Sequence, residues 1–182
     1  MVFAHDTTAA LVLAADLANA GELTDLGALE AFLGKHLDPR PRATLADLDA
    51  VRALRPRLRA VWQAATREEL AELINTLLRD SGARPWLVDH GGGWGWHLHV
   101  TAHDAALEHR IAAQAAFALA DLVRLGEAER LRRCGAPGCD AVLVDLSKNR
   151  SRLYCDTGNC GNRQHVAAYR ERRAGRDSVR TG

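Results

Sequence analysis

Four cysteines near the C-terminal end constrain this chain more than any other feature of its sequence. Cys134 and Cys139 form one Cys-x4-Cys pair, Cys155 and Cys160 form a second, and the chain contains four cysteines in all. Two loops that each offer two thiolates can surround one zinc ion in tetrahedral geometry. Because four thiolates leave no position for a reacting water, the pattern predicts one structural Zn²⁺ rather than a catalytic metal.

Other uses of the four cysteines remain open on spacing alone. They could be buried thiols or form two disulfides, and an iron–sulfur cluster also takes four thiolates. The glycines in and beside the two loops favour zinc, since tight turns around a metal need residues that tolerate positive φ. These glycines are Gly135, Gly138, Gly158 and Gly161.

The charges near the N-terminal end and the length of the apolar runs predict where the protein is located. The first basic residue is Lys35, so the positively charged start of a secretory signal is missing, and no apolar run is long enough to cross a bilayer. We therefore expect a cytoplasmic protein without a membrane partner, in a compartment where paired cysteines bind metal more often than they form disulfides.

The near-neutral net charge of +1 conceals two halves of opposite sign. Residues 1–130 hold 13 Lys and Arg against 18 Asp and Glu, a net charge of −5, whereas residues 131–182 hold 11 against 5, a net charge of +6. Such asymmetry indicates an anionic partner for the basic half. We place a domain boundary at this change, with domains over 1–130 and 131–182.

Hydrophobic periodicity predicts a mainly helical first domain. The chain is 47% hydrophobic but only 5% aromatic, so its core must be built largely from Leu, Ala and Val. Helical spacing predicts a kink or break at Pro56 and places Arg52, Arg55, Arg57 and Arg59 in solvent. The expected helices cover 7–19, 24–37, 44–62, 66–81 and 104–131, and alternation predicts a β-hairpin over 85–90 and 94–101.

The aromatic hairpin offers two functional readings besides a structural one. Trp86, Trp94 and Trp96 are expected to pack in the core, with a small-molecule sensor pocket as the alternative. His97 and His99 share one face of a strand, which we interpret as an exposed polar edge rather than a metal site.

The second domain is predicted to be a treble-clef-like zinc finger. Between the cysteine pairs, residues 141–144 and 151–154 are expected to form two strands joined by the turn 145–150. Helical spacing resumes after Cys160, where Val166 and Tyr169 lie within one turn of each other. A module of about fifty residues with few large apolar side chains depends on its metal for much of its folding free energy. The predicted fold class is thus α+β.

Residues around the cysteines resemble those of the CGNR zinc finger. The resemblance covers both Cys-x4-Cys pairs, the segment 145–152, and Gly161-Asn162-Arg163 after the last cysteine. In that family the finger follows an N-terminal domain called ABATE, and its proteins are proposed to be stress-induced transcription regulators. A looser N-terminal resemblance rests on Asn19, the segment 73–78 and the aromatic hairpin. The resemblance implies DNA as partner and a regulatory function.

Basic residues near the cysteines are the candidate nucleic-acid contacts. Arginine and lysine neutralise phosphates and release counterions, which gives salt-dependent binding. Asn162 and Arg163 have a structural alternative, in which Asn162 caps the last helix and Arg163 pairs with Asp145 or Asp156. The candidates are Lys148, Arg150, Arg152, Asn162, Arg163, Arg170, Arg172 and Arg173.

Three functions follow from these patterns, in decreasing order of support. The first is a non-enzymatic transcription regulator that binds duplex DNA through the zinc finger. The second is a zinc-stabilised protein-interaction module whose basic face meets an acidic partner. The third is an enzyme with its site near the hairpin. A small-molecule effector at the N-terminal domain and a homodimer are left open.

Overall fold

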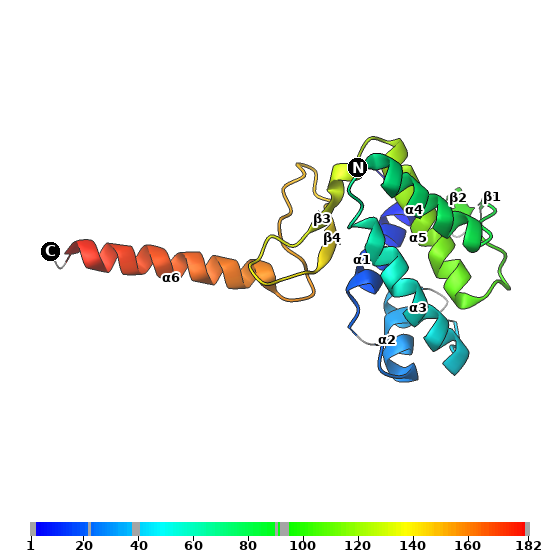
Figure 1. Ribbon diagram of the computed structural model, residues 1–182, viewed down its shortest axis with the longest axis horizontal. Helices are drawn as coiled ribbons and strands as arrows, with labels where there is room; N and C mark the ends of the chain where they lie inside the picture. The colour runs from blue at the N-terminus through cyan, green and yellow to red at the C-terminus, as the bar shows by residue number, and fades with distance from the viewer. Residues whose placement is uncertain (1–2, 22, 38–40, 90, 92–94, 181–182) are drawn as a thin grey trace. The chain divides into compact units, whose positions relative to one another are not determined.

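The chain forms a mainly helical α+β protein, which confirms the predicted fold class. The computed structural model describes residues 3–21, 23–37, 41–89, 91 and 95–180, with side chains as far as Arg173. It divides into two compact units, residues 1–129 and 130–182. The helices of the first unit are α1 (His5–Asn19), α2 (Leu26–His36), α3 (Leu45–Val61), α4 (Arg67–Asp80) and α5 (Leu107–Arg124), and its strands are β1 (Trp86–Val88) and β2 (His97–His99) (Figure 1).

Helix α5 lies at the centre of the first unit and packs against α1, α3 and α4. Five of its alanines are buried, and their small side chains allow neighbouring helices to approach closely. Larger apolar groups fill the spaces between the helices, including Leu11 of α1, Leu58 of α3 and Leu119 of α5, each fully buried. This is the Leu- and Ala-rich core that the composition requires.

Helix α3 differs from expectation at its proline and at its arginines. Pro56 lies inside α3 without splitting it, so the predicted break is absent. Arg52 donates to the carbonyl oxygens of Leu23 and Thr24 at 2.7 and 2.8 Å, and Arg59 donates to that of Ala18 at 3.2 Å. These two side chains are therefore half-buried and connect α3 to the end of α1 and to the segment after it. Carbonyl groups at the end of a helix lack partners within the helix and attract cations.

The long helix predicted over 104–131 is shorter than expected. Helix α5 ends at Arg124, because Gly126 adopts a positive φ of 74° and the N–H of Glu127 bonds back to the carbonyl of Leu122 at 3.0 Å. These features form a Schellman-type helix end. A short 3₁₀ turn, η1 (Ala128–Arg130), then leads into strand β3 (Leu131–Arg133) of the second unit.

The predicted hairpin is confirmed, but its aromatic side chains are not core residues. Strands β1 and β2 pair antiparallel, with Leu87 opposite Leu98. Trp86 is 41% exposed and Trp96 69% exposed, so the expectation that they pack in the core is wrong. The sheet has two strands, and a pair of strands provides few neighbouring side chains for a tryptophan to pack against. Trp94 and His90 lie outside the described residues.

None of the described helices combines the length and the apolar character that crossing a bilayer requires.

Candidate metal centre

The first cysteine pair lies within a β-hairpin of the second unit. Strand β3 pairs antiparallel with β4 (Val142–Val144), so Cys134 leaves one strand and Cys139 stands just before the other. The N–H of Cys134 bonds to the carbonyl of Ala141 at 2.8 Å and extends this pairing to the loop. Gly138 turns the loop with a positive φ of 72°.

The second predicted strand of the finger, 151–154, is absent, and a side-chain network explains why. Buried Asp145 accepts hydrogen bonds from the backbone N–H of Ser147 at 3.0 Å and of Arg152 at 2.9 Å. Arg132 pairs with the same carboxylate at 3.1 Å and also donates to the carbonyl of Arg152. These bonds use backbone groups that a strand ladder would need, so the segment closes as a loop around one carboxylate.

Arg130, the residue just before β3, also holds this loop in place. Its side chain is buried, and one guanidinium nitrogen donates to the carbonyl oxygens of Asp145 and Ser147 at 2.7 and 2.8 Å. The hydrogen bonds to the Asp145 carboxylate outweigh burial and hold its pKa below the ordinary range. The loop 145–152 is thus positioned by ionic and backbone contacts rather than by apolar packing.

The second cysteine pair joins this loop to the last helix. Cys155 follows the loop, and Cys160 begins α6 (Cys160–Arg180). Asn159, the residue before the helix, takes a positive φ of 51°, and the N–H of Arg163 bonds to its carbonyl at 3.2 Å. The predicted start of a helix at Cys160 is confirmed, so the first residue of α6 is also a candidate metal ligand.

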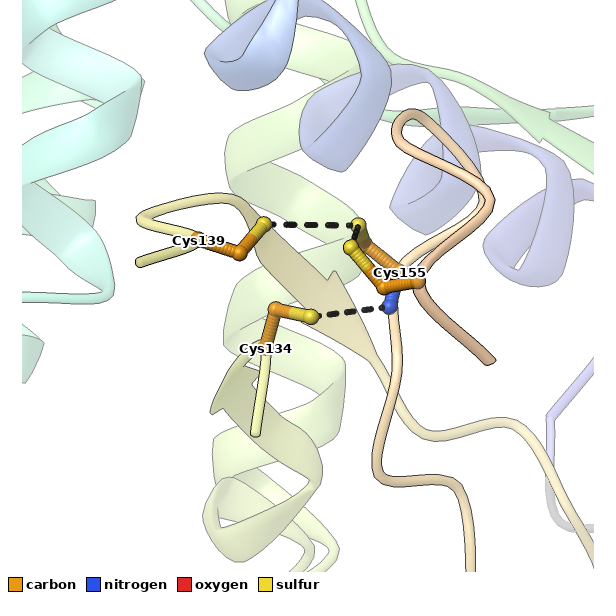
Figure 2. Close-up of side chains that lie close together, drawn as sticks. Cys134, Cys139 and Cys155 are labelled. Carbon is orange, nitrogen blue, oxygen red and sulfur yellow. Dashed lines mark hydrogen bonds between the residues drawn. The ribbon is translucent and has the colours of Figure 1, made fainter. Parts of the chain in front are cut away.

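The four sulfur atoms have the spacing of a tetrahedral zinc site. All lie within 4.8 Å of one another, and Sγ of Cys155 is 3.8 Å from that of Cys139 and 3.7 Å from that of Cys160 (Figure 2). A tetrahedron with zinc–sulfur bonds of about 2.3 Å has edges of about 3.8 Å. Disulfide sulfurs would be only about 2.05 Å apart, and all four cysteines are free thiols. The geometry therefore fits a single metal and excludes two disulfides in this structure.

Hydrogen bonds and burial shift the pKa values of two of the cysteines in opposite directions. Burial alone would raise the pKa of Cys134, but the backbone N–H groups of Cys155 and Ala136 outweigh it and lower the pKa to about 7. The N–H of Cys155 lies 3.4 Å from Sγ of Cys134. Burial raises the pKa of Cys155 to about 12, so this thiol needs a bound cation to ionise near neutral pH. A zinc ion supplies that positive charge when it is bound.

The side chain of Arg163 contributes a cation to the ligand shell. Its guanidinium donates to Sγ of Cys160 at 3.1 Å, which partly offsets the negative charge of four thiolates around a divalent ion. Gly158 makes room for this contact, because a Cβ at that position would stand 3.1 Å from Sγ of Cys160 and 3.5 Å from the guanidinium. The tight packing, rather than a positive φ, explains the glycine at position 158.

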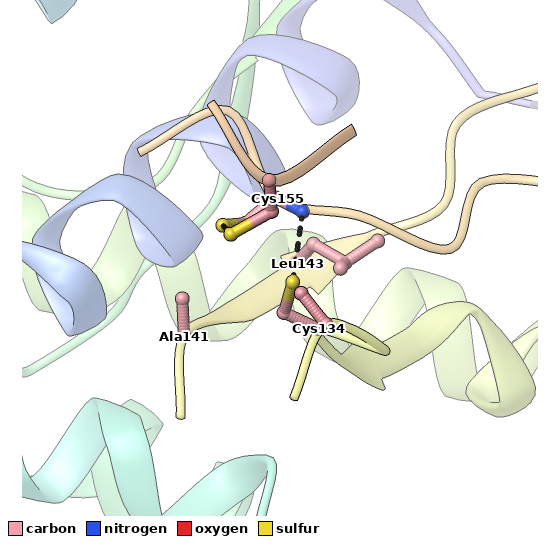
Figure 3. Close-up of a cluster of buried hydrophobic side chains, with 6 residues drawn as sticks. Cys134, Ala141, Leu143 and Cys155 are labelled. Carbon is pink, nitrogen blue, oxygen red and sulfur yellow. Dashed lines mark hydrogen bonds between the residues drawn. The ribbon is translucent and has the colours of Figure 1, made fainter. Parts of the chain in front are cut away.

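The cysteines also make up half of the buried cluster in the second unit. Ala141 and Leu143 are buried beside Cys134 and Cys155 (Figure 3). Ala136 and Cys160 belong to the same cluster, and Tyr154 packs against it. Few other large side chains are available here, so the metal must connect segments that hydrophobic packing alone holds weakly.

The eight candidate nucleic-acid contacts divide into two groups in the structure. Arg152 pairs with Asp156, Asn162 donates to the side chain of Asn159 at 2.8 Å, and Arg163 donates to sulfur. The predicted alternatives, in which Asn162 caps the helix and Arg163 pairs with an aspartate, are therefore replaced by these contacts. The other group is exposed and consists of Lys148, Arg150, Arg170, Arg172 and Arg173.

Sequence reasoning missed the arginines that organise the finger from inside. Arg130 and Arg132 precede the first cysteine and sit on the edge of the predicted helix, so nothing in their pattern marks them as partners of Asp145. The histidine pair follows expectation more closely, since His97 and His99 lie with ring centres 5.2 Å apart on a half-exposed strand. Within the described residues, the four cysteines are the one cluster that could hold a metal.

A helical unit followed by a four-cysteine finger, with one ligand pair in a hairpin and the other at a helix start, defines a treble-clef-like zinc-finger protein. Family models match both parts: residues 130–173 match the CGNR zinc finger, and residues 11–125 match ABATE, described as "Putative stress-induced transcription regulator". The chain belongs to the ABATE family and carries a CGNR zinc finger, as the sequence resemblance implied. A search of curated proteins found no match. The family match and the sulfur geometry together confirm the prediction of one structural zinc.

Proposed function

We propose that the protein is a non-enzymatic transcription regulator whose C-terminal unit binds duplex DNA. The observation that carries this proposal is the exposed basic helix α6, which begins at a metal ligand. Arg170, Arg172 and Arg173 are exposed on it, and no ion pair with a described residue neutralises them. Cationic side chains on a rigid element are suited to phosphate oxygens, because each contact releases counterions from the duplex.

The loop 145–152 supplies a second cationic segment to the proposed surface. Lys148 and Arg150 are exposed in it, and Arg150 takes a positive φ of 52° at the tightest part of the turn. The buried network around Asp145 limits the movement of this segment, which lowers the entropy lost when its side chains bind an anion. We assign the loop to phosphate contacts that orient the unit on the duplex.

The remaining candidates act as positioning residues in this proposal. Arg152, Asn162 and Arg163 already bond to Asp156, Asn159 and Cys160, so they orient the loop and the start of α6. Any contact they make with a duplex would be added to these bonds. The N-terminal unit would then provide assembly or effector sensing in the cytoplasm, and a homodimer remains part of the proposal.

A second candidate function is protein–protein interaction, and the hairpin of the N-terminal unit favours it. Leu87 is 60% exposed and Trp96 is 69% exposed, so the hairpin presents large apolar side chains at the surface. Exposed apolar patches often mark sites of protein interaction. This candidate does not need DNA, and it predicts that the basic helix binds acidic protein instead. Binding measurements with DNA separate the two functions.

The test is the salt dependence of binding to a labelled mixed-sequence DNA duplex of 30 base pairs. The zinc-loaded wild type should bind, and the slope of log affinity against log salt should fall by about three when Arg170, Arg172 and Arg173 are all changed to Ala. The matched control changes three exposed arginines of the other unit, Arg67, Arg79 and Arg84, and should leave the slope unchanged. Absence of wild-type binding at low salt would contradict the proposal.

A further inference from the structure

One face of α6 combines basic and apolar side chains and points to a groove of DNA rather than to phosphates alone. We call it the α6 reading face and define it as Asn162, Val166, Tyr169, Arg170 and Arg173. We propose that this face enters the major groove of B-form duplex DNA. The proposal rests on the proposed function and adds which face of which element reads the duplex.

Helical spacing brings these residues together along one stripe. Asn162, Val166, Tyr169 and Arg173 follow one another at intervals of four, three and four residues, which superimposes them on one side of a helix, and Arg170 flanks them. Arg172, although next to Arg173 in the chain, lies about 100° further round the helix. Two adjacent arginines thus have the same charge but face different directions.

The apolar members of the α6 reading face have no structural use within the second unit. Val166 is 48% exposed and Tyr169 is 59% exposed, whereas apolar side chains that stabilise a helix normally pack against a core. The half-buried side chains in this part of α6 are instead Gln164 and Ala168, which lie on the opposite side of the helix. The exposed stripe is therefore available to a partner.

The shape of α6 suits a groove. It runs for 21 residues and extends away from β3 and β4 beyond its first turn, so the body of the finger does not shield it (Figure 1). An α-helix with its side chains is about 10–12 Å across, and the major groove of B-DNA is about 12 Å wide. Attachment to the candidate zinc site through Cys160 fixes one end of the helix in the finger.

The chemistry of the α6 reading face matches the edges of base pairs in that groove. Arginine guanidinium groups pair with the O6 and N7 atoms of guanine, and apolar groups contact the methyl group of thymine. Arg170 and Arg173 supply the first kind of contact, and Val166 and Tyr169 supply the second. A stripe of phosphate-binding residues alone would have no use for the apolar pair.

A second copy of the chain fits this face poorly. The four-three-four spacing is also that of a coiled-coil seam, but a parallel pair of α6 helices would bring Arg173 of each copy together, and in either orientation each helix carries six arginines against two acidic residues. Like charges at such positions repel, whereas an anionic partner is attracted. Duplex RNA is also unsuited, because its A-form major groove is too narrow for side chains to read. B-form DNA is the partner that satisfies both the charge and the shape.

The first test uses the neighbouring arginines as a matched pair. Arg173→Ala should weaken binding of the zinc-loaded protein to the 30-base-pair duplex about tenfold, because it removes a contact in the groove, and Arg172→Ala should weaken it about threefold or less. Both variants lose one positive charge, and both should keep one zinc per chain and the wild-type circular dichroism. Equal losses would overturn the proposal, because charge alone would then account for binding.

The second test compares nucleic acids with the wild type. At one salt concentration, the DNA duplex should bind at least about tenfold more tightly than an RNA duplex of matching sequence, and the minor-groove ligand distamycin should not displace the protein. Equal affinity for RNA, or displacement by distamycin, would overturn the groove assignment while leaving DNA binding intact. Failure to bind any DNA would instead overturn the proposed function, and the groove assignment with it.

Discussion

The two units of this protein are stabilised in different ways. In the first unit, fully buried leucines such as Leu11, Leu58 and Leu119 pack between helices, and burial of apolar area supplies the main favourable free energy. In the second unit, the buried cluster consists largely of the cysteines themselves with Ala136, Ala141 and Leu143. The comparison indicates that the first unit folds on its own core, whereas the second relies on its metal and on hydrogen-bonded loops.

The principal helices of the two units show the same contrast. Helix α5 is buried on several sides over its length, from Leu107 to Leu122, so it serves as the central element of the core. Beyond the first turn, the described side chains of α6 are at most half-buried, so its direction is set at one end by Cys160 and Arg163 rather than along its length. A helix anchored in this way keeps most of its surface for a partner.

Removing the metal should have the largest effect, and this effect should be confined to the second unit. We expect a chelator to unfold the second unit and leave the helical core of the first, because the bonds between the metal and the four thiolates supply much of the folding free energy of so small a unit. Amide hydrogen exchange should then lose protection over β3, β4 and the start of α6, while α1, α3 and α5 stay protected. Metal analysis before chelation should give one zinc per chain.

One variant, tested without and with chelator, controls for effects of the chelator itself. Cys160→Ser should reproduce the loss of protection in the second unit without any chelator, since it removes one ligand. Adding the chelator to this variant should change little further. Unchanged protection over β3 and β4 in both experiments would contradict the dependence of this unit on its metal.

A core substitution should instead destabilise the first unit and leave the metal site of the second unit intact. Leu119 is fully buried in α5, and Leu119→Ala should lower the free energy of unfolding of this unit by about 3 kcal/mol, within the range found for large-to-small changes in cores. Denaturant unfolding followed by circular dichroism measures the loss. The zinc content should remain at one per chain, and a fall in zinc content would contradict the independence of the two units.

The Arg163 contact with sulfur should have a smaller effect that is confined to the metal. Arg163→Ala should weaken zinc affinity by about tenfold or more, because residues that support metal ligands typically contribute factors of this size. Competition with a chromophoric chelator measures the affinity. Arg172→Ala is the matched control, since it removes the same charge from an exposed position of α6, and equal losses in the two variants would contradict a specific role for the contact with Cys160.

The metal centre was the part most accessible to sequence reasoning, because its information is local. Two Cys-x4-Cys pairs and the start of a helix at Cys160 appear as short patterns, and helical periodicity similarly locates the elements of the first unit. Strand pairing is different, because the partner of Val142–Val144 depends on contacts between distant residues. Residues 151–154 were expected to pair as a strand with 141–144, but the backbone N–H of Arg152 bonds instead to the carboxylate of Asp145.

Exposure was also difficult to predict, for a related physical reason. Trp96 and Leu98 alternate with polar residues as a half-buried strand does, yet a two-stranded sheet supplies no cover for them. Arg52 and Arg59 appeared as polar positions of α3, although backbone carbonyls bind them: Arg59 donates to Ala18 in the last turn of α1, and Arg52 donates to Leu23 and Thr24 in the segment after that helix. Periodicity describes which residues share a face, but it does not describe what lies opposite that face.

The smallest predicted effect concerns a polar contact between α1 and α2. Asp16 accepts Lys35 at 2.6 Å and lies 3.2 Å from the buried ring of His36. The close approach of the His36 ring is the main reason that the pKa of Asp16 is below its ordinary value of 3.8, and Lys35 lowers it further. A carboxylate with a lowered folded-state pKa stabilises the protein above its unfolded-state pKa, and this contribution disappears as pH falls through the folded-state value.

Asp16→Asn should therefore lower Tm at pH 6, by an amount corresponding to less than about 1 kcal/mol, and the difference from wild type should shrink as pH falls below 3.8. Thermal unfolding of the two proteins over this pH range measures the effect. Asp49→Asn is the control, because Asp49 pairs with Arg52 at the surface and is 78% exposed. A difference at Asp16 that stays constant with pH would mean that packing, rather than the ionised carboxylate, connects the two helices, and the first unit would then owe even this polar contact to its core.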